Sequence, residues 1–321
     1  MSGAEAPDVP TDAPDVPTDA RLPVTVIGGY LGTGKTTLVN HLLRHADGRR
    51  LAVLVNEFGE LPIDADLIEA AEDDVIALAG GCVCCSYGND LASAFATLRE
   101  REPDHVLVEA SGVALPGAIA STLGLIPGLS RESTVVLADA ETLGARATDR
   151  YVGDTVTRQL ASAELVLLNR CDLAGDEALD SARATIRNAA PRALVVEVEH
   201  ARVPPEALLD GVPGTVPGNL SGGDERARIV HPRFASAVLR SDRRVDINAL
   251  VDWLTSDGTG VVRAKGVVRD IDDALRQVQV AGGRATVATA PRDAAPGLVV
   301  IGLRPLFHPA MLDKYATPTI G

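Results

Sequence analysis

Aromatic residues and basic charge are both scarce in this sequence. The 321 residues include one Trp, four Tyr and four Phe, so the core must be built mainly from Val, Leu, Ile and Ala. Such a composition suits parallel sheets that are buried on both faces. Lys and Arg number 30 against 44 Asp and Glu, which gives a net charge of -14. A chain this acidic lacks the basic face that nucleic-acid binding requires, so we expect no nucleic-acid partner.

Cysteine and long apolar runs are also scarce. Four cysteines in 321 residues are too few for a disulfide scaffold. The chain has no unbroken apolar run of about 18 residues and no signal-peptide pattern, so we expect a cytoplasmic protein with no membrane partner. Hydrophobic residues still make up 46% of the chain, which is enough to build a sizeable core.

The composition changes along the chain and predicts an α/β protein with two folded parts. Residues 1–20 contain APDVPTD twice in succession and predict a disordered acidic tail. Residues 21–210 alternate β-branched runs with helical patterns, which predicts a mostly parallel sheet flanked by helices. Residues 211–228 have the composition of a linker, and residues 229–321 predict a smaller C-terminal α+β domain. The strand-like runs of the first part are 24–28, 51–55, 75–79, 105–109, 134–138, 165–169 and 194–198.

The stretch VTVIGGYLGTGKTT reads as a strand, a glycine loop and the start of a helix. It satisfies G-x-x-x-x-G-K-[ST], the pattern of loops whose backbone N–H groups wrap phosphates. We expect Lys35 to reach the β- and γ-phosphates and the Thr36 hydroxyl to ligate Mg²⁺. The nucleotide-binding residues predicted here are Gly29, Gly32, Thr33, Gly34, Lys35, Thr36 and Thr37.

Two further motifs follow strand-like runs and extend this site. Asn169 and Asp172 form N-x-x-D, and a carboxylate there accepts both N–H donors of guanine, which favours GTP and GDP over adenine nucleotides. In VEASG, we expect Glu109 to hold Mg²⁺ through water and the Gly112 N–H to meet the γ-phosphate. Ser111 is alternatively, and compatibly, the cap of a helix. The residues predicted to take part in catalysis are Lys35, Thr36, Glu109 and Gly112.

Together, these motifs resemble the CobW-type metal-chaperone GTPase family, P-loop proteins related to the urease and hydrogenase nickel chaperones. The family marks stand in order as GGYLGTGKTT (28–37), VNEFGE (55–60), GGCVCC (80–85), VEASG (108–112), LNRCDL (168–173) and RAKGVV (263–268). The resemblance covers about residues 21–310. Two departures stand out: Arg170 replaces the lysine of N-K-x-D, and the six histidines form no His-rich loop.

The resemblance implies a function as well as a fold. It implies that VNEFGE is the switch segment that follows the γ-phosphate, and that GGCVCC is the C-x-C-C metal motif. The implied activity is GTP hydrolysis coupled to delivery of zinc, or of cobalt or iron, to a client metalloprotein. Two alternatives stay open: a nucleotide-gated interaction protein with structural zinc and little turnover, and a P-loop kinase of a small metabolite. Homodimerisation is also left open.

The cysteines themselves favour a metal site. Soft thiolates at Cys82, Cys84 and Cys85 select Zn²⁺, Cu⁺ or Fe–S chemistry over Mg²⁺, and three ligands with an open position suit an ion that is passed onward. Glu57 and Glu60 are the candidates for completing the zinc site. A redox pair, which requires a strained small ring, and simple packing of small residues are the alternatives. We expect Cys171 to pack apart from this cluster.

Overall fold

The computed structural model describes residues 21–56, 75–80, 95–209, 233–239, 244–291, 294, 296–304 and 306–317. The predicted tail, the linker, the C-x-C-C motif and most of VNEFGE lie outside these ranges. In the part of the chain that is described, no helix has both the length and the apolar character needed to cross a membrane.

The N-terminal part contains a seven-stranded sheet in the order β3-β2-β4-β1-β5-β6-β7, and every pairing in it is parallel. Each strand is rich in Val, Leu, Ile and Ala, and each of the seven predicted runs forms one, so the prediction of a mostly parallel sheet is confirmed. The strands are β1 (Leu22–Gly29), β2 (Leu51–Asn56), β3 (Val75–Gly80), β4 (His105–Ala110), β5 (Leu129–Asp139), β6 (Leu165–Asn169) and β7 (Leu194–Glu197).

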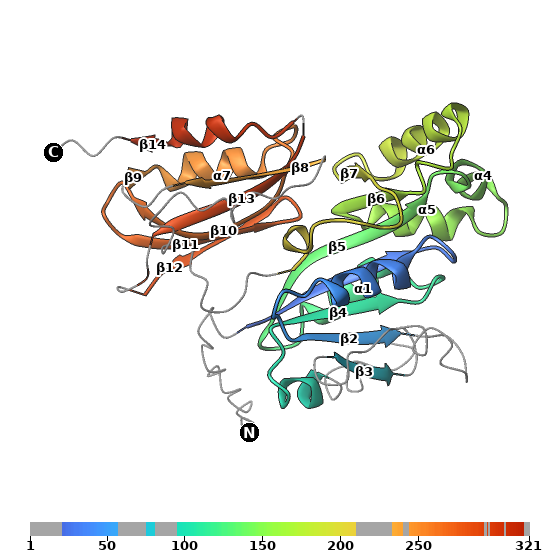
Figure 1. The fold of residues 1–321 in the computed structure, drawn as a ribbon, viewed down its shortest axis with the longest axis horizontal. Helices are drawn as coiled ribbons and strands as arrows, with labels where there is room; N and C mark the ends of the chain where they lie inside the picture. The colour runs from blue at the N-terminus through green and yellow to red at the C-terminus, as the bar shows by residue number, and fades with distance from the viewer. Residues whose placement is uncertain are drawn as a thin grey trace, which may run out of the picture.

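Helices cover both faces of this sheet (Figure 1). Successive strand residues point to opposite faces, so Val135 and Leu137 pack with α1 while Val136 and Ala138 pack with α4, α5 and α6. Helix α3 covers the part of the second face that is formed by β1 and β4. The helices are α1 (Lys35–Arg44), α3 (Pro116–Leu123), α4 (Leu143–Thr148), α5 (Gly153–Ala161) and α6 (Asp176–Ala189), followed by the 3-10 turn η3 (Pro205–Ala207).

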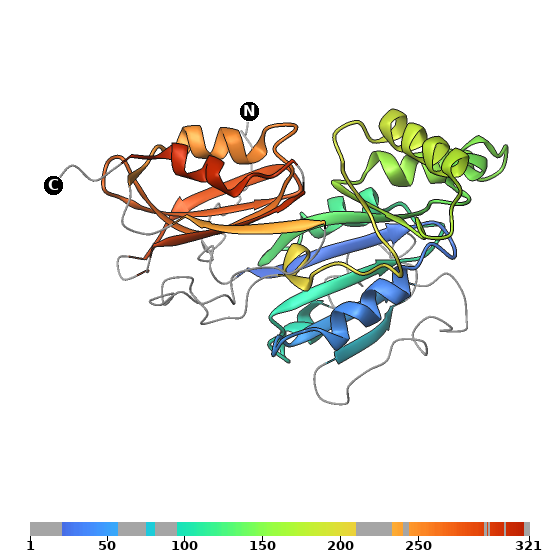
Figure 2. The same cartoon turned by 45° about the horizontal axis from the view of Figure 1, so that its top comes forward.

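The C-terminal part is α+β, as predicted. Five antiparallel strands run in the order β12-β11-β10-β13-β8, and β9 joins β10 in parallel and β14 in antiparallel orientation. Helix α7 and the 3-10 helix η6 cover one face of the sheet (Figure 2). The elements are β8 (Phe234–Leu239), β9 (Arg244–Val245), α7 (Ile247–Thr255), β10 (Val261–Asp270), β11 (Leu275–Ala281), β12 (Arg284–Thr289), β13 (Gly297–Leu303), η6 (Pro309–Tyr315) and β14 (Ala316–Thr317).

The two parts share a core and a buried polar contact. One apolar cluster continues from α1 and the parallel sheet to Phe234 and Ile301 of the C-terminal sheet. Arg263 of β10 pairs with Glu132 of β5 at 3.1 Å, and both side chains are buried. Glu132 lies near the start of β5, so the C-terminal part packs at the amino ends of the parallel strands. The carboxyl ends, where loops bind ligands in such sheets, face the other way.

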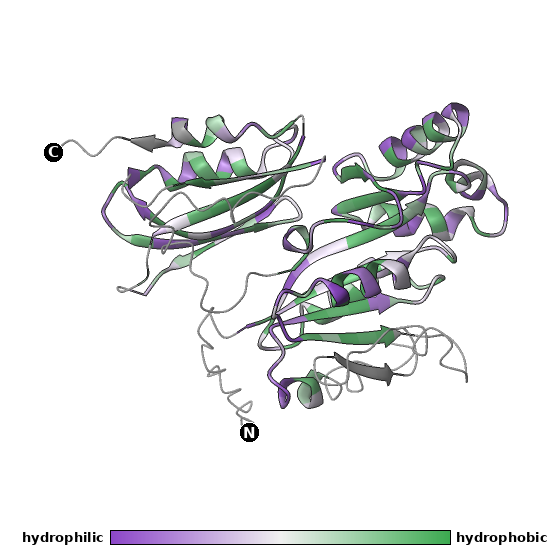
Figure 3. Cartoon of the chain, in the orientation of Figure 1, coloured by the Kyte–Doolittle hydropathy of each residue, from purple (hydrophilic) through white to green (hydrophobic). Residues whose placement is uncertain are grey.

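Apolar residues follow this architecture. Figure 3 shows them concentrated along the strands of both sheets, such as β2 and β13, while polar residues gather on the outer side of α6. The hydrophobic core is therefore formed by the strands and the inner faces of the helices.

Candidate nucleotide site

The phosphate loop spans residues 29–34 and joins β1 to α1 at the carboxyl edge of the sheet. Gly29, Gly32 and Gly34 have φ angles of 136°, 74° and 104°, a region that favours glycine. A Cβ on Gly29 would lie 2.4 Å from the Leu137 carbonyl oxygen, and one on Gly34 would lie 2.6 Å from Asn169 Nδ2. The backbone conformation therefore favours glycine at all three positions, and close neighbours leave no room for a side chain at Gly29 and Gly34.

The loop closes on the carbonyl oxygen of Tyr30. That oxygen accepts hydrogen bonds from the Thr33 hydroxyl at 2.9 Å and from Lys35 Nζ at 3.3 Å. Helix α1 begins at Lys35 behind Gly34, which makes no side-chain cap, and Thr37 is exposed on its first turn. An uncapped helix N-terminus behind a glycine loop presents N–H groups to an anion, so this geometry fits a bound phosphate chain.

A hydroxyl and a carboxylate meet at the mouth of this loop. Thr36 Oγ1 donates to Glu109 Oε1 at 2.9 Å, although the two residues are 73 positions apart in the sequence. Glu109 is 2% exposed and lies near the end of β4, which pairs with β1. Both groups offer hard oxygen ligands, so the donor set fits Mg²⁺.

Gly112 lies in the turn after β4 and touches the phosphate loop. A Cβ on Gly112 would lie 2.4 Å from Leu31 Cδ2 and 3.0 Å from the Leu31 backbone nitrogen. Gly112 therefore lets the chain pass close beside the loop. The alternative role of Ser111 as a helix cap is wrong, because α3 begins at Pro116 and Leu115 is its N-cap residue.

Asn169 binds protein backbone on both sides of its amide. Its Nδ2 donates to the Thr33 carbonyl at 3.0 Å, and its Oδ1 accepts from the Ala201 N–H at 2.9 Å. The side chain is 3% exposed, so it joins the phosphate loop to the loop after β7. Asp172 is exposed in the turn that follows Asn169. The two residues of N-x-x-D therefore have different surroundings.

Arg170, the departure from the family pattern, is paired with a carboxylate. Its Nη1 lies 2.7 Å from Asp139 Oδ2, and Asp139 is 2% exposed at the end of β5. Asp139 Oδ1 also accepts from the Glu141 N–H at 3.0 Å. The guanidinium is thus held on β5, next to the strand that carries Asn169.

Two further parts of this edge are not among the site residues that the sequence predicts. His200 and Ala201 are both in the left-handed region, at φ 51° and 53°, and strained backbone of this kind gathers at functional sites. No local pattern marks these two residues. The sequence does contain a pattern that indicates Asp139. This residue is the polar end of the apolar run TVVLAD, just as Glu109 and Asn169 are the polar ends of their own apolar runs.

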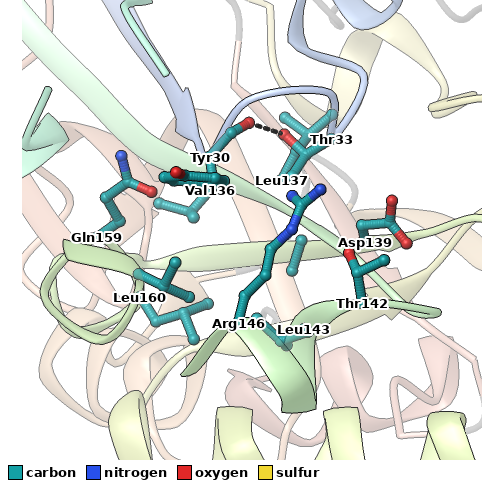
Figure 4. A pocket seen from close by; sticks show the side chains of 12 residues that line it. Tyr30, Thr33, Val136, Leu137, Asp139, Thr142, Leu143, Arg146, Gln159 and Leu160 are labelled. Atoms are coloured by element: carbon teal, nitrogen blue, oxygen red, sulfur yellow. Dashed lines mark hydrogen bonds between the residues drawn. The ribbon is translucent and has the colours of Figure 1, made fainter. Parts of the chain in front are cut away.

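A small cavity of about 10 Å³ lies behind the phosphate loop (Figure 4). Tyr30, Val136 and Leu160 line it, and Arg146 rises beside it from α4 toward the loop. Gln159 of α5 is buried there and donates to the carbonyl oxygens of Gly112, at 3.0 Å, and Ala114, at 2.8 Å. Helices α4 and α5 therefore support both the phosphate loop and the turn after β4.

The proposed zinc ligands Cys82, Cys84, Cys85, Glu57 and Glu60 lie outside the described residues. The strands that lead to them are described. In the sheet register, Asn56 at the end of β2 pairs with Gly80 of β3 on one side and with Ala110 of β4 on the other. The segments carrying VNEFGE, GGCVCC and VEASG therefore begin side by side, at the edge that holds Thr36 and Glu109.

Cys171 has the surroundings of a packing residue. Its Sγ–H donates to the Leu168 carbonyl at 3.1 Å, and the side chain packs against the core formed by β5, β6, α4, α5 and α6. Burial raises the pKa of the Cys171 thiol to about 11, with a further contribution from the nearby Glu197 carboxylate. Within the described ranges, no three His, Cys, Asp or Glu side chains are arranged to hold a metal ion.

The phosphate loop, the paired hydroxyl and carboxylate, and the loops gathered by Asn169 define a P-loop nucleotide-binding protein. Residues 23–197 match the family described as CobW/HypB/UreG, nucleotide-binding domain, and residues 234–313 match the cobalamin synthesis protein cobW C-terminal domain. The chain belongs to the CobW/HypB/UreG family, and the resemblance inferred from the motifs is confirmed.

The chain is similar to proteins that are named zinc chaperones and to a solved GTPase structure. The zinc chaperone CobW of Sinorhizobium sp. is 29% identical over 294 residues, covering 78% of this chain and 79% of the relative. The zinc chaperone CobW of Pseudomonas aeruginosa is 36% identical over 225 residues, covering 59% of this chain and 60% of the relative. Among solved structures, zinc-bound YjiA GTPase from E. coli is 21% identical, covers 92% of this chain and 98% of that chain, and has a TM-score of 0.45.

Proposed function

We propose that this protein is a GTP-hydrolysing metallochaperone that binds zinc at Cys82, Cys84 and Cys85 and transfers it to a client metalloprotein. The observation that carries the proposal is the register that pairs Asn56 with both Gly80 and Ala110. It starts the switch segment and the thiol segment on neighbouring strands, beside the Thr36–Glu109 pair. The names of the relatives, zinc chaperones and zinc-regulated GTPase metalloprotein activators, support the same function.

The nucleotide half of the proposal rests on the carboxyl edge of the sheet. Lys35 and the N–H groups of residues 29–36 bind the phosphates, and the Gly112 N–H meets the γ-phosphate. Asp172 accepts the two N–H donors of guanine, while Asn169 holds the phosphate loop in register with the base-binding turn. Thr36 and Glu109 would hold Mg²⁺, which would supply positive charge beside the β- and γ-phosphates.

The metal half rests on the cysteines. Three thiolates hold zinc, Glu57 or Glu60 completes the site, and cobalt or iron is the alternative cargo. The segment from Val55 to Glu60 is ordered by GTP and relaxes after hydrolysis, which opens the metal site to the client. To change from mostly zinc-bound to mostly zinc-free, the protein needs zinc affinities that differ about 10⁴-fold between its GTP-bound and GDP-bound states, or by about 5.5 kcal/mol.

Zinc affinity measured in each nucleotide state tests the proposal. Competition titration of the full chain with GDP, and with a non-hydrolysable GTP analogue, should give different zinc affinities. Cys84→Ser should weaken zinc binding strongly and leave GTP affinity near that of the wild type. Cys171→Ser is the matched control and should change neither affinity.

The alternatives give different results in the same assays. An unchanged zinc affinity in Cys84→Ser would contradict the proposed metal site. Zinc affinity that ignores the nucleotide, together with negligible turnover, would point to an interaction protein with structural zinc, because linkage between two binding sites is reciprocal. Phosphate transfer to a metabolite instead of water would point to a kinase.

A further inference from the structure

Arg146 approaches the phosphate loop from outside. It lies in the last turn of α4, and its Nη1 donates to the Leu31 carbonyl oxygen at 2.9 Å. Its guanidinium carbon lies 5.1 Å from the centroid of the Tyr30 ring. Figure 4 shows the side chain extending from α4 to the loop beside Tyr30. Two consecutive loop residues thus bind one arginine, through a ring face and a backbone carbonyl.

This contact fixes the direction of one peptide group. In a trans peptide, the carbonyl of one residue and the N–H of the next point in opposite directions. Arg146 holds the Leu31 carbonyl toward α4, on the outer side of the loop. The Gly32 N–H is therefore directed to the inner side, where loops of this kind bind phosphate.

The contact also strengthens that N–H as a donor. A hydrogen bond from a guanidinium is charge-assisted, and hydrogen bonds that share one peptide group polarise each other. Preorganised N–H donors aimed at developing negative charge are a main source of catalysis in phosphoryl transfer. An arginine behind the loop thereby acts on the phosphates through the Leu31–Gly32 peptide.

We propose that Arg146 is a positioning residue for hydrolysis, which aims and polarises the Gly32 N–H toward the phosphates in the transition state. This inference rests on the proposed GTPase function. It assigns a role in cis to an arginine that no motif in the sequence marks, since Arg146 lies in the segment ETLGARATDR.

Arg150 is a matched control. It lies four residues further along, and its guanidinium carbon is 4.2 Å from the Tyr151 ring centroid on the exposed surface. Leu143 supplies the buried side chain of α4, so replacement of either arginine leaves the packing of this helix in place.

The experiment compares wild type, Arg146→Ala, Arg146→Lys and Arg150→Ala in single-turnover GTP hydrolysis. Affinities for GDP and for GDP with aluminium fluoride, a transition-state mimic, are measured in parallel. Arg146→Ala should lower the rate of hydrolysis and the affinity for the mimic roughly tenfold, because the lost donor acts through the peptide. Its affinity for GDP should stay within about twofold, since only transition-state stabilisation is lost. Arg146→Lys should recover most of the rate, and Arg150→Ala should match the wild type.

Each contrary outcome has a distinct meaning. Equal hydrolysis rates in Arg146→Ala and Arg150→Ala would overturn the role of Arg146 and leave the proposed GTPase function standing. An equal loss of affinity for GDP and for the mimic would also overturn it, because it would show general support of the loop. Absence of GTP hydrolysis in the wild type would overturn both proposals. If Arg146→Ala does not fold, Arg146→Met, which keeps an apolar stem and removes the donor to Leu31, takes its place. The same selective loss of rate and of affinity for the mimic would support the proposal, and a wild-type rate would overturn it.

Discussion

Replacing Asn169 by alanine separates the two tasks of the N-x-x-D motif. The Asn169 amide makes two hydrogen bonds, at 3.0 Å to the Thr33 carbonyl and at 2.9 Å from the Ala201 N–H. Both partner residues are buried, at 2% and 0% exposure, so water has little access to the backbone groups left behind. We expect the variant to lose the connection between the phosphate loop and the loop after β7.

The magnitude follows from these two bonds. Each hydrogen bond contributes about 1 kcal/mol net, and a buried group left without a partner costs about 1–3 kcal/mol. The two lost bonds together cost at least about 2 kcal/mol. This loss falls on the bound conformation of the loop that we propose binds nucleotide, so binding should be at least roughly 30-fold weaker. Because Asn169 binds backbone, the loss should be the same for guanine and adenine nucleotides.

Titration with fluorescent GDP and ADP analogues measures both affinities. Asn169→Ala should weaken both and keep their ratio, whereas Asp172→Ala should weaken GDP alone. Asn188→Ala, on the exposed surface of α6, is the control for loss of an asparagine. A changed ratio of the two affinities in Asn169→Ala would refute the reasoning, because it would show that Asn169 itself reads the base.

Three further predictions concern stability and reactivity. Arg263→Met leaves the buried carboxylate of Glu132 without its ion pair, so urea denaturation should show a free energy of unfolding about 3–5 kcal/mol lower than that of the wild type. Adding Glu132→Gln to this variant should restore part of the lost stability. Burial lowers the pKa of His105 well below its usual value near 6.5, so the unfolded chain takes up this proton first as the pH falls. The free energy of unfolding should therefore fall by about 1.4 kcal/mol per pH unit below about pH 6.5. His105→Gln should remove this contribution to the pH dependence of stability, and an unchanged pH dependence in the variant would contradict the prediction. In a variant whose only thiol is Cys171, burial raises the pKa of that thiol to about 11. The folded chain should therefore react with iodoacetamide at pH 8 roughly 100-fold more slowly than the unfolded chain. Rapid labelling of the folded chain would be incompatible with that burial.

Most strands of the parallel sheet were predictable, because a strand buried on both faces is a short run of β-branched and aliphatic residues. The main difference lies in β5, which begins at Leu129, five positions before the predicted run. Its first half, LSRES, is too polar to resemble a buried strand. Glu132 is buried there because Arg263 and Gln279 of the C-terminal sheet bind its carboxylate.

The C-terminal sheet was predicted only in part. The sequences FASAVL and GLVVIGL are typical of strands and form β8 and β13, and INALVDWL has the pattern of a helix and forms α7. The two-residue strands β9 and β14 have no sequence signature, because their pairing depends on β10 and on each other.

The sequence by itself determined the chemistry that is local. The spacing of glycines, Lys35 and Thr36 encodes a phosphate loop, since backbone conformation and side-chain type are set within a few residues. It also placed Glu109 and Asn169 at strand ends, where ligands bind in parallel sheets.

Only the tertiary structure decided what these residues touch. Thr36 meets Glu109 across 73 positions, Asn169 meets Thr33 across 136, and Arg146 meets Leu31 across 115. These contacts depend on the strand order β4-β1-β5-β6, which brings distant loops to one edge of the sheet. Hydrogen bonds act over about 3 Å, so no local pattern can encode a partner that the fold alone brings within reach.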